Sequence, residues 1–328
     1  MLFVTGPIRD FIWESGDEPR EDRQVRKPAI YLLLAIVVAV LGLNWPIMAT
    51  GIKSISPIWM GVLRVAGAAV VVALIAGASG NLRVPPRRDL PVVASLAVFR
   101  LAAVFTLVFT ALELVPASRS AVVVWTTSLW TVPIAAVFLS ERVSGQRWVG
   151  LSLGIVGVIV LFEPWGLAWD DPDITLGHAL LILAAIINAA TAVHIRGHRW
   201  TITPLQALPW QLAGAAVLLV TLGLVLEGLP VIEWTPQLAG VVVYQGVLAS
   251  GIALWASIVV LRNLAAVSTN LTLMGVPVVG VISSAFFLDE QITAELAIGL
   301  ILVVGGVSLN LLSDRARPVQ TTRVSEVG

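Results

Sequence analysis

The sequence predicts an all-α integral membrane protein with ten transmembrane helices, arranged as two inverted five-helix repeats. Three observations predict this fold: the composition, a one-sided distribution of basic residues, and a repeat with an offset of 149 residues. Of the 328 residues, 58% are hydrophobic and 12% are charged, whereas soluble domains carry about 25% charged residues. The chain is therefore expected to lie in a lipid bilayer.

Apolar runs of about 20 residues are long enough to cross a bilayer, and polar or Pro- and Gly-containing breaks separate them here. They predict ten spans, at 29–50, 57–79, 90–113, 117–139, 145–163, 174–195, 204–227, 236–261, 265–288 and 292–312. Short connections such as GIKSIS make consecutive spans antiparallel. The flanking segments 1–28 and 314–328 are expected to be cytoplasmic tails, and the first has no apolar core of a secretory signal.

Basic residues gather on one side of these spans. With the N-terminus inside, Lys53 and Arg119 fall on the outer side, Arg64 and Arg100 lie within spans, and the remaining Lys and Arg are inside. The outer loops carry acidic residues instead: Asp170, Asp171, Asp173, Glu227, Glu233, Asp289 and Glu290. This bias follows the positive-inside rule, so both termini are expected in the cytoplasm and the protein in the inner or plasma membrane.

The stretch 117–161 is echoed in register by the stretch 266–310. Matched pairs are Ala136 and Ala285, Phe138 and Phe287, Glu141 and Glu290, Gly150 and Gly299, and Gly157 and Gly306. A second match aligns 56–70 with 203–217 at an offset of 147 residues. Because five spans per half is an odd number, the repeats over 29–163 and 174–313 are expected to be inverted. This organisation is typical of secondary transporters, whose sites lie where the halves meet.

Other function classes find little support in the composition. The chain has no cysteine, which excludes disulfides and thiol chemistry. It has no HExxH or GxSxG motif and no carboxylate near the middle of a span, so an enzyme is not expected. We expect no cofactor, no metal and no nucleic acid. The expected partners are a small-molecule substrate and the bilayer, for a monomer or homodimer.

Several phrases resemble the EamA family of the drug/metabolite transporter superfamily. They are LELVPASRSAV with VPIAAVFLSERVSGQRWVGLSLGIVGVIVL, VLRNLAAVSTNLTLMGVPVVGVISSAFFLDEQITAELAIGLILVVGGV, and AVLGLNWPIMATGIKSISPIWMGVLR, which ends on Arg64. The resemblance covers about 29–313 and implies a carrier of small metabolites, amino acids among them. The chain departs from the family pattern at Ser128, where a proline is usual, and at Arg100, where an arginine is rare.

Arg100 is the sharpest candidate for a site residue. It lies ten residues into its span, which places it about 15 Å deep at 1.5 Å per residue. An arginine at the centre of a membrane helix costs at least about 2.5 kcal/mol, so it must face water or a partner. It either binds an anionic group of the cargo, such as a carboxylate, in bidentate geometry, or it pairs with backbone carbonyls and polar side chains to lock two helices.

Other polar residues lie deep in the spans and are candidates for the lining of a substrate cavity. They are Asn44, Thr126, Thr127, Asn188, Gln245 and Asn270. Gln245 has a depth similar to that of Arg100 in the equivalent span of the other repeat, so the two are candidates to face each other. Each amide can instead form a helix–helix hydrogen bond, worth about 0.6 kcal/mol in membranes.

Trp125 and Trp130 are deep aromatic candidates, but five residues place them on different helix faces. At most one of them is expected to line a cavity. Pro46, Pro133 and Pro277 interrupt spans and free backbone carbonyls. They are candidate hinges for alternating access or static kinks. Glu141 and Glu290 lie at loop edges, where capping or salt bridges are favoured over transport chemistry.

The sequence thus predicts a secondary transporter, an exporter of amino acids or related carboxylates. Alternatives are an uptake carrier for a vitamin or nucleoside-like compound, and a lipid or structural membrane protein. The chain has three histidines, and none is central to a span. Since proton-coupled carriers usually bury acids or histidines, a facilitator or exchanger is favoured.

Overall fold

The computed structural model describes residues 27–139, 144–162, 171–198, 200–253, 256 and 272–315, and in these parts of the chain it is helical with short connections. The elements are α2 (Lys27–Gly51), α3 (Pro57–Ala78), α4 (Leu90–Ser95), η1 (Leu96–Ala103), α5 (Val104–Leu114), α6 (Ala117–Trp125), α7 (Thr127–Phe138), α8 (Gly145–Phe162), α9 (Pro172–Gly197), α10 (Pro204–Leu226), α11 (Pro236–Val243), η2 (Tyr244–Ile252), α14 (Gly275–Leu288) and α15 (Ala294–Arg315).

Six helical stretches of the described chain are long and apolar enough to cross a membrane. They are 30–51, 57–78, 90–114, 117–138, 172–197 and 204–226, and the described parts also include four shorter apolar helices, 145–161, 236–252, 275–288 and 294–309. Their outward faces expose large apolar side chains such as Leu74, Phe138 and Ile301, as lipid-facing surfaces do. The protein is therefore a multi-pass membrane protein.

Helix starts follow simple local rules. The helices α3, α9, α10 and α11 each begin with a proline, whose missing N–H costs nothing at the first helical position. Thr203 also forms a capping box with Gln206 at the start of α10. These signals explain why the predicted starts at 57 and 204 coincide with the observed ones.

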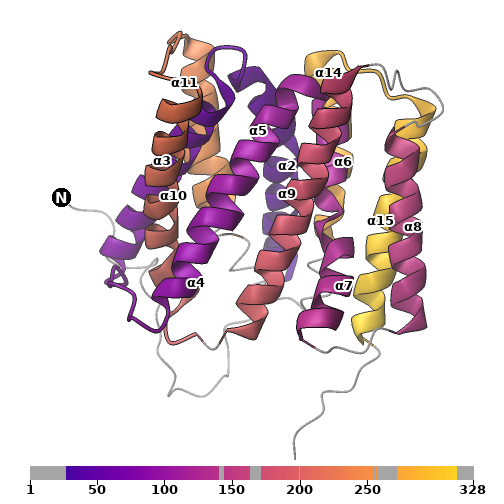
Figure 1. The fold of residues 1–328 in the computed structure, drawn as a ribbon, viewed down its shortest axis with the longest axis horizontal. Coiled ribbons are helices and arrows are strands. Elements are labelled where there is room, and N and C mark those ends of the chain that lie inside the picture. Colours follow the sequence, from indigo (N-terminus) through magenta and orange to yellow (C-terminus); the bar gives the residue numbers. More distant parts are fainter. Residues whose placement is uncertain are drawn as a thin grey trace, which may run out of the picture.

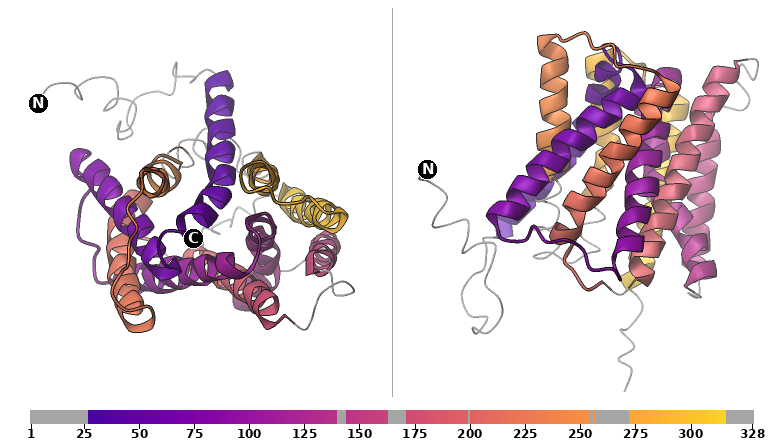
Figure 2. Two further views of the ribbon diagram at one scale, coloured as in Figure 1. Left: turned by 90° about the horizontal axis from the view of Figure 1, so that it is seen from above. Right: turned by 60° about the vertical axis from the view of Figure 1, so that its left-hand side comes forward.

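The bundle has a pair of helices at each end (Figure 1). At one end α3 packs along α10, and at the other α8 packs along α15. Between these pairs α2 packs against α14, and α9 packs against α5 and α7. Figure 2, seen from above, places α2, α5, α9 and α14 between the two end pairs.

Small residues let α8 and α15 approach to backbone contact. A Cβ added at Gly306 would lie 2.5 Å from the carbonyl oxygen of Gly150, and one added at Gly157 would lie 3.0 Å from that of Gly299. Close helix contact through small residues is the usual way to stabilise helix pairs in membranes, where association relies on van der Waals packing.

Two carboxylates tie the helices together at one end of the bundle, which we call the Glu227 end. Glu227 accepts hydrogen bonds from the backbone N–H of Ile58 (2.9 Å) and from the Ser56 hydroxyl (2.7 Å), at the start of α3. Glu290 accepts from the backbone N–H of Ala117 (2.8 Å), at the start of α6. The capping interpretation of Glu290 is thus confirmed, while Glu141 lies outside the described residues.

A third carboxylate ties the loops together at the opposite end, which we call the Asp89 end. Asp89 precedes α4 and is fully buried. It accepts hydrogen bonds from the Thr201 hydroxyl, from the Thr201 backbone N–H (3.2 Å) and from His198 Nε2 (2.8 Å), between α9 and α10. These hydrogen bonds, those of Thr201 first, hold the pKa of Asp89 below its usual value.

We expect Asp89→Asn to lower the thermal unfolding midpoint at pH 7, because the variant loses an acceptor for two donors. A carboxylate with a lowered folded pKa stabilises the fold above its unfolded pKa of about 3.9, and this contribution is lost as pH falls through the folded pKa. The difference in unfolding midpoint between wild type and variant, measured in nanodiscs, should therefore shrink below about pH 4. A gap that is constant from pH 7 to pH 3.5 would contradict this role.

Candidate functional site

A cavity of about 470 Å³ lies inside the bundle, near the middle of the helices. Five residues expected at the site from the sequence line it: Asn44, Arg100, Trp125, Thr127 and Asn188. They come from α2, η1, α6, α7 and α9. Segments that are far apart in the sequence therefore bring these polar side chains to one space.

Other expected site residues lie elsewhere. Thr126 is buried, and its hydroxyl donates to the Val123 carbonyl (2.6 Å). Trp130 donates from its indole to Thr126 Oγ1 (3.2 Å) and is not among the residues that line the cavity. Gln245 is fully buried behind the cavity wall. Asn270 lies outside the described residues.

Gln245 contacts Arg64 rather than Arg100. Arg64, on α3, lines the cavity and donates from Nη1 to Gln245 Oε1 and to Asn44 Oδ1 (3.3 Å). Its guanidinium also lies 4.7 Å from the ring centroid of Phe105, within cation–π range. The expected pairing of Gln245 with Arg100 is thus replaced, because α3 packs directly against η2 and places Arg64 beside Gln245.

Sequence reasoning missed Arg64 and three further lining residues, Ser128, Gln211 and Ser250. The signal for Arg64 was present, since it is one of two arginines within predicted spans. Arg64 is the eighth residue of α3, so it lies nearer the end of its span than Arg100 does. Its site role depends on packing, which brings Asn44 and Gln245 to it from α2 and η2.

Arg100 lies on η1, a π-helical stretch of eight residues within the span Leu90–Leu114. π-helical turns are rare and frequently occur at functional sites, because they shift side chains relative to a regular helix. The Arg100 side chain is exposed to the cavity. It has no hydrogen bond or ion pair with any described residue.

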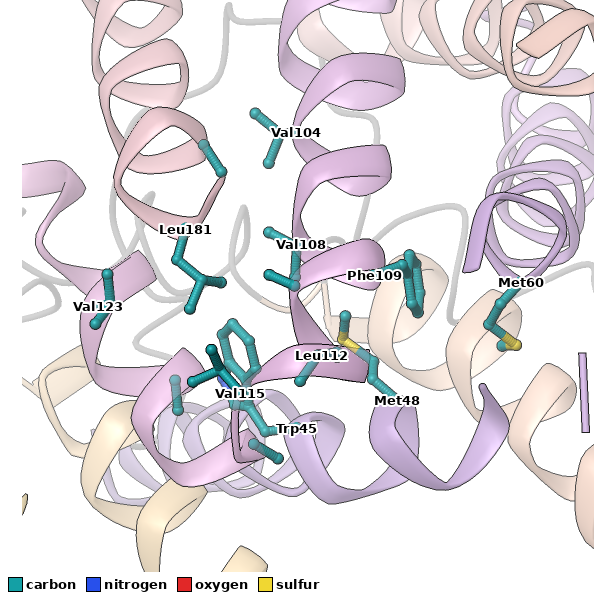
Figure 3. Close-up of a cluster of buried hydrophobic side chains, with 14 of the residues drawn as sticks. Trp45, Met48, Met60, Val104, Val108, Phe109, Leu112, Val115, Val123 and Leu181 are labelled. Atoms are coloured by element: carbon teal, nitrogen blue, oxygen red, sulfur yellow. The ribbon is translucent and has the colours of Figure 1, made fainter. Parts of the chain in front are cut away.

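The cavity ends along α5 before the Glu227 end. Val104 and Val108 line it, whereas Phe109, Leu112 and Val115 are buried beyond it. Figure 3 shows this cluster, in which Trp45 and Met48 of α2 lie beside Leu112 and Val115. Toward the other end the cavity reaches Leu208, in the first turns of α10 near the Asp89 end. Apolar packing thus closes the site on one side.

The span 117–138 breaks at Thr126, between α6 and α7, and Pro133 lies within the continuous helix α7. The expectation that Pro133 interrupts this span is therefore wrong. The hydroxyls of Thr126 and Thr127 donate to carbonyls three residues earlier, a competition with backbone donors that bends helices. Pro277 falls in the first turn of α14, just after a turn at Met274.

Pro46 lies within α2, where it leaves the Gly42 carbonyl, four residues earlier, without its helical N–H donor. The Pro46 carbonyl accepts from the Thr50 hydroxyl (2.8 Å), and α2 continues on both sides of the proline. No group of three or more His, Asp or Glu side chains that could hold a metal ion occurs within the described ranges.

This arrangement is suited to binding a polar solute away from the lipid. The chain matches the EamA-like transporter family over residues 28–163 and 175–312. It is 23% identical over 290 residues to "Uncharacterized transporter YoaV" of Bacillus subtilis, covering 88% of this chain and 99% of that protein. It is also 25% identical to "Probable amino-acid metabolite efflux pump" of Escherichia coli, covering 89% and 97% of the two chains.

Two further likenesses agree with this match. "Probable terminal-alkyne amino-acid exporter" of Streptantibioticus cattleyicolor is 26% identical, over 84% of this chain and 91% of that protein. A crystal structure superimposes with a TM-score of 0.61 at 20% identity, over 89% of this chain and 99% of that one, and so shows a shared fold. The family match spans nearly the whole described bundle, and the chain belongs to the EamA-like transporter family.

Proposed function

We propose that this protein is a secondary transporter that exports amino acids or related carboxylate-bearing metabolites by alternating access. The observation that carries the proposal is Arg100, a cation near the middle of its span, exposed to the cavity and without a partner among the described residues. At membrane depth such a residue marks a substrate or ion pathway. A guanidinium matches a carboxylate bidentately.

We also propose that ten helices form two inverted repeats, over 29–163 and 174–313. Contacts between glycines of α8 and α15 support this proposal, because shifting each residue by the repeat offset turns one contact into the other. The contact of Gly150 with Gly306 maps onto the contact of Gly299 with Gly157, at an offset of 149 residues. A two-fold relation between α8 and α15 requires this reciprocity.

Contacts between α3 and η2, and between α10 and η1, support the same symmetry. A Cβ added at Gly67 would lie 3.3 Å from the Cα of Gly246, and one added at Gly214 would lie 3.3 Å from the Cβ of Ala97. Gly67 corresponds to Gly214 at offset 147, and Ala97 to Gly246 at offset 149. The two π-helical stretches, 96–103 and 244–252, also correspond.

The proposed orientation places both termini in the cytoplasm of a cell with this protein in its inner or plasma membrane. The Asp89 end is then cytoplasmic and the Glu227 end is external. In this orientation the buried cluster around Leu112 closes the external side of the cavity, as an inward-facing state requires. The names of the Escherichia coli and Streptantibioticus relatives support export and an amino-acid cargo.

The experiment is counterflow in proteoliposomes that contain the full chain. Labelled amino acids, dicarboxylates, vitamins and nucleosides are tested one at a time, with protein-free liposomes as the control. We expect accumulation of carboxylate-bearing compounds, and the same initial rate with and without a protonophore, as for a facilitator or exchanger. Accumulation of a vitamin or nucleoside without any carboxylate would contradict the proposal and favour an uptake carrier.

A further inference from the structure

Two arginines from different helices line the same cavity. Arg64 projects from α3 and Arg100 from η1. The described residues that line this cavity include no Asp, Glu, Lys or His. Among the described residues, the site therefore holds two positive charges and no group of opposite charge.

The described groups that hold Arg64 in place are all neutral. Its Nη1 donates to the amide oxygens of Asn44 and Gln245 and to the sulfur of Met48 (3.4 Å), and Phe105 lies beside it. The side chain is 7% exposed. Dipoles and an aromatic face orient a guanidinium, but they do not neutralise its charge.

This cluster also leaves hydrogen-bonding capacity unused. Within the described structure, Arg64 Nε and Gln245 Nε2 are buried donors without an acceptor. Buried polar groups normally have a partner, and an unsatisfied one calls for an explanation. A bound anion that approaches Arg64 from the cavity supplies an acceptor for its guanidinium.

We propose that the cargo carries two acidic groups, one bound by Arg64 and one by Arg100. This inference rests on the proposed function and names its substrate class: small dicarboxylates, including dicarboxylic amino acids. A compound with one carboxylate leaves one of the two arginines unpaired. A cavity of about 470 Å³ is of ordinary size for a small-molecule site.

The two arginines favour separate acids over a single doubly charged group. Asn44 and Gln245 fix the Arg64 guanidinium against α2 and η2, whereas Arg100 extends from η1 with no described partner to draw it toward Arg64. One phosphate would have to bring both cations to a single point. Inorganic phosphate is therefore the natural competing probe.

The test is competition in proteoliposomes loaded for counterflow of labelled glutamate or aspartate. Glutamine and asparagine are matched competitors, because each replaces one carboxylate by an amide of similar size. With wild-type protein, we expect the inhibition constants of glutamate and aspartate to be at least tenfold lower than those of their amides. Phosphate should compete weakly.

Two variants locate the two charges. We expect Arg100→Gln and Arg64→Gln each to reduce the difference in inhibition constant between the acids and their amides to about threefold or less. Each substitution removes a charge that only the second acidic group of the cargo uses. Arg100→Lys should keep part of the preference. Arg100 has no described partner to disturb, so its variants should keep the fold even where Arg64→Gln does not.

The outcomes separate this inference from the proposed function. Equal competition by acids and amides, or stronger competition by phosphate, while a monocarboxylate is transported, would overturn the two-acid cargo alone. Absence of counterflow for every carboxylate would overturn the proposed function and this inference together.

Discussion

Replacement of Arg100 by glutamine is expected to raise the KM for a carboxylate cargo about 10- to 100-fold. Hydrogen bonds to charged groups contribute about 1.5–3 kcal/mol, and each 1.4 kcal/mol corresponds to about a tenfold change in affinity. The measurement is the initial rate of counterflow over a range of cargo concentrations. Because Arg100 has no partner among the described residues, the variant should unfold at the same temperature as wild type.

Arg87→Gln is the matched control for this experiment. Arg87 is exposed in the loop before α4, away from the cavity, so its loss removes the same charge without touching the site. Its KM should equal that of wild type. If Arg100→Gln transported carboxylates with the wild-type KM, Arg100 would have no role in binding the cargo.

Gly306→Ala is expected to destabilise the protein by about 1–3 kcal/mol, the usual cost of overpacking. The added methyl group would lie 2.5 Å from the Gly150 carbonyl oxygen and 2.7 Å from the Gly154 backbone nitrogen. Both are backbone atoms of α8, so the two helices must move apart. Thermal unfolding in detergent, followed by intrinsic tryptophan fluorescence, measures the effect.

The neighbouring glycine provides the control. A methyl group at Gly305 would meet only the Leu153 side chain, at 3.5 Å, which is an ordinary contact. Gly305→Ala should therefore unfold at the wild-type temperature or slightly above it, since alanine favours the helix over glycine. Equal midpoints for the two variants would contradict the close packing of α8 on α15.

Much of the fold could be predicted because single-helix rules decide it. Apolar runs and proline at the first helical position place the spans that begin at 57 and 204 within a residue or two of the observed helices. Such signals are local in the sequence. They do not depend on which helix packs against which.

The candidate site could be predicted only in part, because its geometry depends on packing between distant segments. Arg100 stood out as a charge at membrane depth, and the structure exposes it to the cavity. The contact of Arg64 with Gln245 joins residues 181 positions apart, and nothing in the sequence specifies that register. The π-helical stretches and the break at Thr126 likewise arise from hydrogen bonding that periodicity does not reveal.

We propose that the cavity around Arg64 and Arg100 is the cargo site and opens to one side of the membrane at a time. The chain has no cysteine, so single cysteines can report access without further changes. Ser128 lines the cavity, whereas Ser284 is fully buried away from it. Ser128→Cys and Ser284→Cys are therefore a matched pair of probes.

The deciding measurement is the rate at which a membrane-impermeant maleimide labels these cysteines in oriented vesicles. We predict that Ser128→Cys reacts from the cytoplasmic side, that saturating glutamate slows this reaction severalfold, and that Ser284→Cys stays unlabelled. Labelling of Ser128→Cys at one rate with and without every transported compound would contradict the account, because a cargo bound in this cavity must cover that position.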